Sequence, residues 1–213
     1  MTTTHYSALE ETLHALSHGT GALLSVIGLV LMLTIVLPLN NYWYLASSLI
    51  YGVSLILLYS SSTLYHAISN AGIKHRLRQL DHAAIFILIA GTYTPFTLLN
   101  LRDNWGLPLF VLIWTVALAG VIIELATGLK YKKLSLGLYL GMGWLVIIAI
   151  EPMLNHVAPQ GLLLLVAGGL SYSFGVIFYA WKRLYLHHVI WHLFVLAGSI
   201  LHFLAVYLYA LQN

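Results

Sequence analysis

The chain has 213 residues, of which 61% are hydrophobic and 7% are charged, and its formal net charge is +3. A soluble domain carries about 25% charged residues, so this composition excludes an ordinary water-soluble protein, which needs a polar surface. The basic residues are few and lie in short segments, which argues against nucleic-acid binding. The chain contains no cysteine, so disulfides and thiolate metal ligands are excluded as well.

The N-terminal segment precedes the first long apolar run. Ser7 and Glu10 have the spacing of a capping box, and Leu9, Leu13 and Leu16 fall on one helical face. This pattern predicts a short amphipathic helix over residues 7–17 at the membrane surface, with a frayed tail as the alternative.

Seven apolar runs follow, each long enough to cross a bilayer, which takes about 20 helical residues. They fill nearly the whole chain, so we predict an all-α, polytopic membrane protein with one domain, a bundle of seven transmembrane helices. Gly91 and Pro95 predict a kink in the third helix. The expected spans are roughly 19–38, 43–66, 81–100, 107–128, 134–153, 161–181 and 188–210.

Basic residues alternate between the connections. The connections after the second, fourth and sixth runs hold eight of the nine Lys and Arg residues, and only Arg102 lies elsewhere. Short cytoplasmic loops carry an excess of Lys and Arg. We therefore expect a multi-pass protein of the plasma (cytoplasmic) membrane, with a cytoplasmic N-terminus and an external C-terminus. The eight residues are Lys74, Arg76, Arg78, Lys130, Lys132, Lys133, Lys182 and Arg183.

This topology brings polar residues from three separate runs to one depth of the membrane. The second run ends with Ser62 and His66 on the cytoplasmic side, the third begins there at Asp81, and the last begins with His188 and His192. Residues four positions apart lie on one helical face, with Cβ atoms about 5–6 Å apart. His188 and His192 have this spacing, as do Ser62 and His66.

Three imidazoles from two helices form a candidate metal site. Zinc held by three His ligands with an open fourth position is the catalytic type of site, and the open position holds a water of lowered pKa. Asp81 is suited to accept a proton from that water, and Ser62 to donate a hydrogen bond to an oxyanion. All-nitrogen ligation also suits iron, copper or nickel. We expect Zn²⁺ because it fits hydrolytic chemistry.

Structural roles compete with these assignments. A His pair at a helix end is also typical of interfacial polar residues, and Asp81 suits a helix cap as well as a catalytic role. His18 begins the first run at the same depth, where it either supports the ligands or caps the helix. His202 lies ten residues beyond His192, about 15 Å along the helix axis. It cannot share the metal, and we expect it in a hydrogen bond inside the bundle.

The combined pattern resembles the hemolysin III family, which belongs with the progestin and adiponectin receptors and, more distantly, the alkaline ceramidases. The resemblance extends from Glu10 to Tyr209. It is carried by Ser17-His18-Gly19, Ser62-Thr63-Leu64-Tyr65-His66-Ala67, Asp81, Gly91-Thr92-Tyr93-Thr94-Pro95-Phe96 and His188-x3-His192.

The resemblance implies a seven-helix bundle with an intramembrane zinc ion held by His66, His188 and His192. It also implies that Ser62 and Asp81 lie beside the zinc-bound water. One departure concerns the first helix. Relatives commonly have Asn four residues before the His of that helix, where this chain has His14, so the role of that position is open.

Two functions remain in competition. We favour a metal-dependent hydrolase acting on a lipid amide or ester, such as a ceramide-like lipid, near the inner leaflet. The alternative is a non-catalytic receptor or regulator of membrane homeostasis with structural zinc. A pore-forming cytolysin is disfavoured because the expected spans leave no water-soluble form that could convert, and a transporter because no helix carries a row of ionisable residues across the bilayer. Membrane lipids are the expected partners and nucleic acid is not. The sequence leaves the oligomeric state open.

Overall fold

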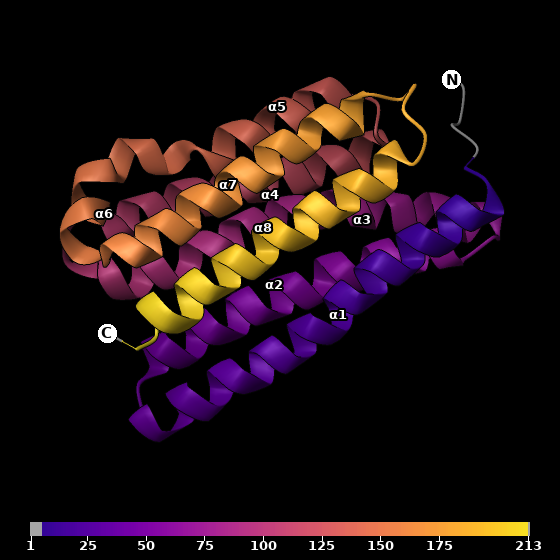
Figure 1. Ribbon diagram of the computed structural model, residues 1–213. Coiled ribbons are helices and arrows are strands. Elements are labelled where there is room, and N and C mark those ends of the chain that lie inside the picture. The colour runs from indigo at the N-terminus through magenta and orange to yellow at the C-terminus, as the bar shows by residue number, and fades with distance from the viewer. Residues whose placement is uncertain (1–5, 213) are drawn as a thin grey trace.

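The computed structural model describes residues 6–212, which form a helical bundle without strands within that range (Figure 1). Short turns η1 (Leu37–Leu39), η2 (Phe96–Asn100), η3 (Arg102–Gly106) and η4 (Leu145–Ala149) join or extend the main helices. The main helices are α1 (Ala8–Val36), α2 (Tyr42–Ala67), α3 (Ala71–Pro95), α4 (Leu107–Thr127), α5 (Lys132–Gly143), α6 (Ile150–His156), α7 (Pro159–Ala180) and α8 (His187–Tyr209).

Seven segments in the described range are long and apolar enough to cross a membrane, because α5, η4 and α6 together make one span, Lys132–His156. The predicted all-α fold with seven transmembrane helices is thus confirmed. Large apolar side chains such as Leu23, Ile122 and Leu163 are exposed on the outside of the bundle, where a bilayer replaces water as their solvent.

Neighbouring helices pack in an order that leaves the first and last helices side by side. α1 packs on α2, α2 on α3 and α3 on α4, while α8 packs on both α7 and α1. Figure 1 shows α8 between α7 and α1, with the start of α1 and the end of α8 at opposite ends of the bundle. The first turns of α1 and α8 therefore lie at the same end as the last turn of α2.

The expected surface helix over residues 7–17 is not a separate element. Ser7 caps the helix and forms the predicted capping box with Glu10, but α1 then continues without a break to Val36. The prediction of two segments was wrong because the first turns of α1 bury polar side chains against other helices. His14 and His18 are both buried there.

One further boundary differs from expectation, and one expected irregularity is present. The third span begins at Ala71 rather than near residue 81, because the Asn70 side chain caps the helix by accepting hydrogen bonds from the backbone of Gly72 and Ile73. Its basic residues consequently lie on the first turns of α3 rather than in a loop. The expected irregularity at Pro95 is present, since the regular helix ends there and continues as the π-helical turn η2.

Close packing in the bundle depends on small residues and buried hydroxyls. A Cβ atom at Gly120 would lie 2.4 Å from the ring of Phe86, so α4 can approach α3 this closely only with glycine there. Tyr59 of α2 and Tyr172 of α7 both hydrogen-bond to Ser199 of α8, each at 2.8 Å. These bonds connect three helices at a level deeper in the bundle than the histidine cluster.

Candidate metal centre

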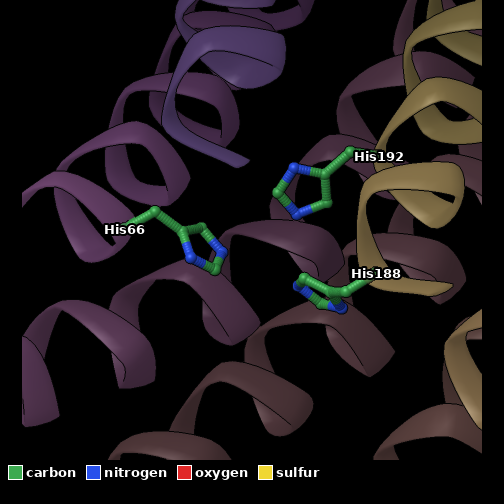
Figure 2. A group of neighbouring side chains, drawn as sticks. All are labelled: His66, His188 and His192. Atoms are coloured by element: carbon green, nitrogen blue, oxygen red, sulfur yellow. The ribbon is translucent and has the colours of Figure 1, made fainter. Parts of the chain in front are cut away.

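The three predicted ligand residues lie together at the end of the bundle where α1 begins. His66 lies in the last turn of α2, and His188 and His192 lie one turn apart at the start of α8. One donor atom from each of the three lies within 4.8 Å of those of the other two. Figure 2 shows the three rings turned toward a common point between α2 and α8. The group has a donor set of the kind that binds a metal ion, and its donor atoms are close enough that it could hold one.

A carboxylate on α1 orients His66. The His66 Nδ1 atom lies 2.6 Å from Glu11 Oε2, and the other Glu11 oxygen lies 3.0 Å from Lys74 Nζ. A carboxylate only accepts hydrogen bonds, so the proton lies on His66 Nδ1. Nε2 of His66 is buried without a hydrogen-bond partner. This is the arrangement in which a carboxylate fixes the tautomer of a metal-ligating histidine.

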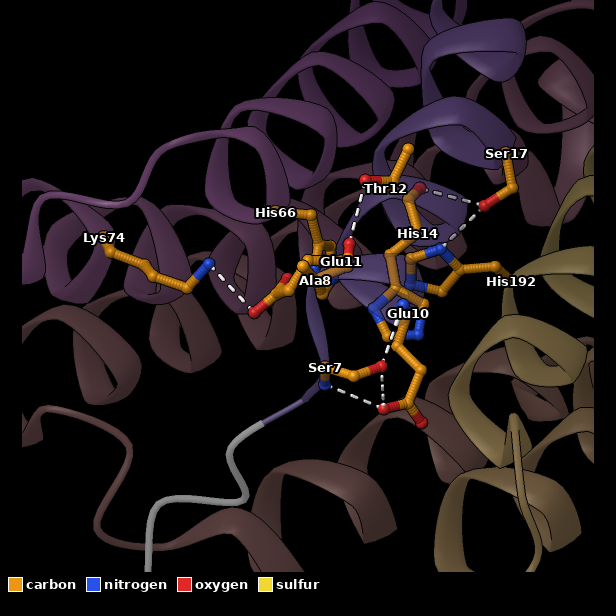
Figure 3. A network of polar contacts seen from close by, with 10 residues as sticks. All are labelled: Ser7, Ala8, Glu10, Glu11, Thr12, His14, Ser17, His66, Lys74 and His192. Carbon is orange, nitrogen blue, oxygen red and sulfur yellow. Dashed lines mark hydrogen bonds and ion pairs between the residues drawn. The ribbon is translucent and has the colours of Figure 1, made fainter.

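The second support comes from Ser17, also on α1. Its hydroxyl oxygen lies 3.1 Å from His192 Nδ1 (Figure 3). This contact leaves Nε2 of the His192 ring to bind a metal ion. His18 stacks on His192 with ring centroids 3.5 Å apart and planes 14° apart. Of the two roles considered for His18, the structure favours support of a ligand over a helix cap.

His14 and Tyr6 complete the cluster on the N-terminal side. His14 is fully buried, and its ring centroid lies 4.5 Å from that of His66. The Tyr6 ring stacks on His188 at 5.3 Å and meets His14 edge-on at 4.8 Å. Burial raises the pKa of Tyr6, so its phenol stays neutral over the cluster. Tyr6 therefore lies against two of the three candidate ligands, and His14 lies against all three.

The contributions of Glu11 and Ser17 were not predicted from the sequence. A signal was present, because Glu11, His14 and His18 recur at three and four residues and so share one helical face. The leucines of the expected interfacial helix occupy the same segment and obscured that periodicity. A polar stripe on an otherwise apolar helix indicates a buried polar neighbour, and here the neighbour is the histidine cluster.

Ser62 and Asp81 lie in the wall of a cavity that adjoins the cluster through His188 and His192. Ser62 is buried on α2, and Asp81 lies on α3. The structure thus brings the two residues proposed as catalytic to the same cavity as two of the three predicted ligands. Their placement agrees with the prediction of a shared depth.

The cavity, about 160 Å³ in volume, continues away from the cluster between α2, α3, α5, α7 and α8. It reaches His202, about 15 Å along the axis of α8 from His192. His202 lies 3.1 Å from the Leu165 carbonyl through Nε2, as expected for a hydrogen bond inside the bundle. Most of the wall is aliphatic or aromatic, including Leu58, Ile85 and Trp191. The space is elongated and largely apolar, with Ser62, Asp81, His188 and His192 toward one end and His202 toward the other.

Comparison with known proteins agrees with this architecture. Residues 6–203 match the family model described as Haemolysin-III related. The chain belongs to this family. It is 42% identical over 207 residues to the hemolysin-3 homolog of Bacillus subtilis, covering 97% of each chain. Identity to hemolysin-3 of Bacillus cereus is also 42%, covering 96% of this chain and 93% of that one.

A more distant relative comes from animals. The chain is 31% identical to the human monocyte to macrophage differentiation factor over 182 residues, which are 82% of this chain and 74% of that protein. The aligned regions of all three relatives cover most of the transmembrane bundle. This hemolysin III-type protein is therefore an integral multi-pass membrane protein with a group of three histidines that could hold a metal ion.

Proposed function

We propose that this hemolysin III-type protein is an intramembrane zinc hydrolase that acts on a lipid amide or ester near the inner leaflet. The observation that carries the proposal is the position of the cavity. A group of three histidine donors within 4.8 Å of one another opens onto an elongated apolar space whose polar end also holds Ser62 and Asp81. Such a space suits one alkyl chain with its polar linkage at the histidines.

The ligand set favours zinc. Three neutral imidazoles would hold the ion through nitrogen, and the described residues around them offer no thiolate, as the whole chain lacks cysteine. Bound there, zinc supplies Lewis acidity and a water of lowered pKa. Glu11 holds His66 in orientation through Nδ1, and Ser17 does the same for His192. Neither ring therefore has to reorganise when the metal ion binds.

The residues of the cavity wall provide the remaining chemistry. Asp81 is placed to take the proton released when water attacks the carbonyl carbon and to return it to the leaving nitrogen or oxygen. Ser62 is placed to donate a hydrogen bond to the carbonyl oxygen as negative charge develops on it. The aliphatic wall excludes bulk water from the linkage and holds the lipid chain.

The decisive experiment measures metal content and lipid hydrolysis on purified protein in detergent. We expect about one zinc per chain in the wild type and its loss in a variant with His66→Ala, His188→Ala and His192→Ala. A panel of ceramides, other N-acyl lipids and lipid esters then tests for turnover. Asp81→Asn should abolish turnover while zinc stays bound. Turnover that persists in Asp81→Asn would refute the role of Asp81.

One observation favours a second function, a non-catalytic membrane regulator with structural metal. The candidate centre joins α2 and α8 through its ligands and α1 through Glu11 and Ser17. An ion bound there would hold these three helices together. A ligand that binds only the folded state stabilises it by mass action. Zinc content with a large stability loss on chelation, and no hydrolysis of any lipid in the panel, would select this function over the hydrolase.

A further inference from the structure

His14 occupies a place in the histidine cluster that neither proposed role explains. Its side chain has no exposed surface, and both ring nitrogens are buried without a hydrogen-bond partner. A buried polar group without a partner destabilises the fold, so two unpaired nitrogens in one ring require a compensating interaction. Its neighbour Glu11 does not provide it, because the two Glu11 oxygens bind His66 and Lys74.

The positions of four histidine rings indicate which interaction compensates for the two unpaired nitrogens of His14. The centroids of His14, His66, His188 and His192 are separated by 4.5, 4.8 and 5.2 Å for the three pairs with His14, and by 5.5, 5.2 and 4.6 Å for the others. Four points with six similar separations form a tetrahedron. With metal–nitrogen distances of about 2.0–2.1 Å and tetrahedral angles, the centroids of four imidazole ligands lie about 5.2 Å apart.

His14 also has a donor atom close to one of the candidate ligands, because donor atoms of His14, Glu11 and His66 lie within 4.8 Å of one another. The ring centre of a histidine lies almost on the line of its Cβ–Cγ bond, so rotation about that bond redirects the ring nitrogens of His14 with little movement of its centroid. The ring can therefore present a nitrogen to a shared ion without leaving its place among the other three rings.

We propose that His14 is a fourth, displaceable ligand that closes the metal centre of this protein. The inference rests on the metal site of the proposed function. A closed set of four protein ligands is the structural form of a zinc site, and three ligands with an open position are the catalytic form. His14 would then hold the centre closed, and its departure would admit water and the lipid linkage. The first turns of α1 are the part of the fold that controls this exchange.

The experiment uses the full-length protein loaded with Co²⁺, whose visible spectrum reports the ligands, and titrates azide as a small competing ligand. The variant is His14→Asn, and the matched control is His75→Asn, because His75 is an exposed histidine on α3. We expect the wild type and the control to need at least about tenfold more azide than His14→Asn for the same spectral change. We also expect His14→Asn to lose cobalt to a chelator about 10–100-fold faster.

Two results would overturn the inference. Equal azide responses and equal cobalt retention in the wild type and His14→Asn would show that His14 is not a ligand. If the wild type takes up no cobalt, the chain has no such metal centre, and the proposed zinc hydrolase is wrong as well. The azide response of the wild type tests the closed site even if His14→Asn folds poorly, which its circular dichroism would reveal. If the cobalt spectrum of the wild type resists azide and that of His14→Asn does not, but no lipid is hydrolysed, the assignment of His14 stands. Only the hydrolase is then rejected.

Discussion

Glu11 offers the sharpest test of how the candidate centre is organised, because its carboxylate contacts a proposed ligand without being one. Its Oε2 atom lies 2.6 Å from His66 Nδ1, a short distance typical of a charge-assisted hydrogen bond. Glu11→Gln keeps the size of the side chain and removes its charge. The amide can still accept a hydrogen bond from His66, but it no longer favours the imidazole that pushes electron density toward Nε2.

The magnitude follows from the geometry. Mutation of a hydrogen-bond partner of this kind reduces metal affinity about 10–100-fold, or about 1.4–2.7 kcal/mol. The pair is part-buried, and the His66 side chain has no exposed surface, so solvent screens its contact with Glu11 only weakly. Lys74 contributes less, because its side chain is 26% exposed and it meets the other oxygen of Glu11 at the surface.

The assay is competition for zinc between the purified protein and a chelator of known affinity. The matched control is Glu10→Gln, because the adjacent Glu10 carboxylate bonds to the Ser7 cap. We expect Glu11→Gln to bind zinc about 10–100-fold more weakly than the wild type, and Glu10→Gln to remain within about twofold. Affinity of Glu11→Gln within about twofold of the wild type would show that His66 needs no carboxylate to bind the metal, and the orienting role assigned to Glu11 would be wrong.

Removal of the metal by a chelator should lower the thermal midpoint of the wild type, since a metal concentration of 100 times the Kd stabilises the folded state by about 2.7 kcal/mol. The thermal midpoint of His66→Ala should not respond to the chelator, and equal shifts of the two midpoints would argue against the site. Gly120→Ala should destabilise the bundle by about 1–3 kcal/mol through collision with Phe86, whereas Gly137→Ala, with open space around its Cβ, should be neutral or slightly stabilising in the same denaturation assay. A reporter fused to the C-terminus should be active outside the cytoplasm, as the loop charges predict, and cytoplasmic activity would reverse the topology.

Much of the fold could be read from the sequence because membrane helices are specified locally. Each span is a run of apolar residues long enough for the bilayer, and the alternation of basic residues orders the runs without knowledge of their packing. The boundary errors arose where a helix begins with polar turns, as after the caps Ser7 of α1 and Asn70 of α3. The apolar run begins later in the chain, whereas the backbone hydrogen bonds of the helix begin at the cap.

The sequence by itself also determined which residues could be ligands, because His188 and His192 share a helical face and topology places His66 at their depth. The tertiary structure decided what surrounds them. Packing of α1 against α2 and α8 brings Glu11, Ser17 and His14 to the cluster, and helix order alone does not fix that rotation. The face of a helix that meets its neighbours is set by side-chain packing over its whole length. For that reason the candidate ligands were visible in the sequence, and the groups that contact them from α1 emerged only from the fold.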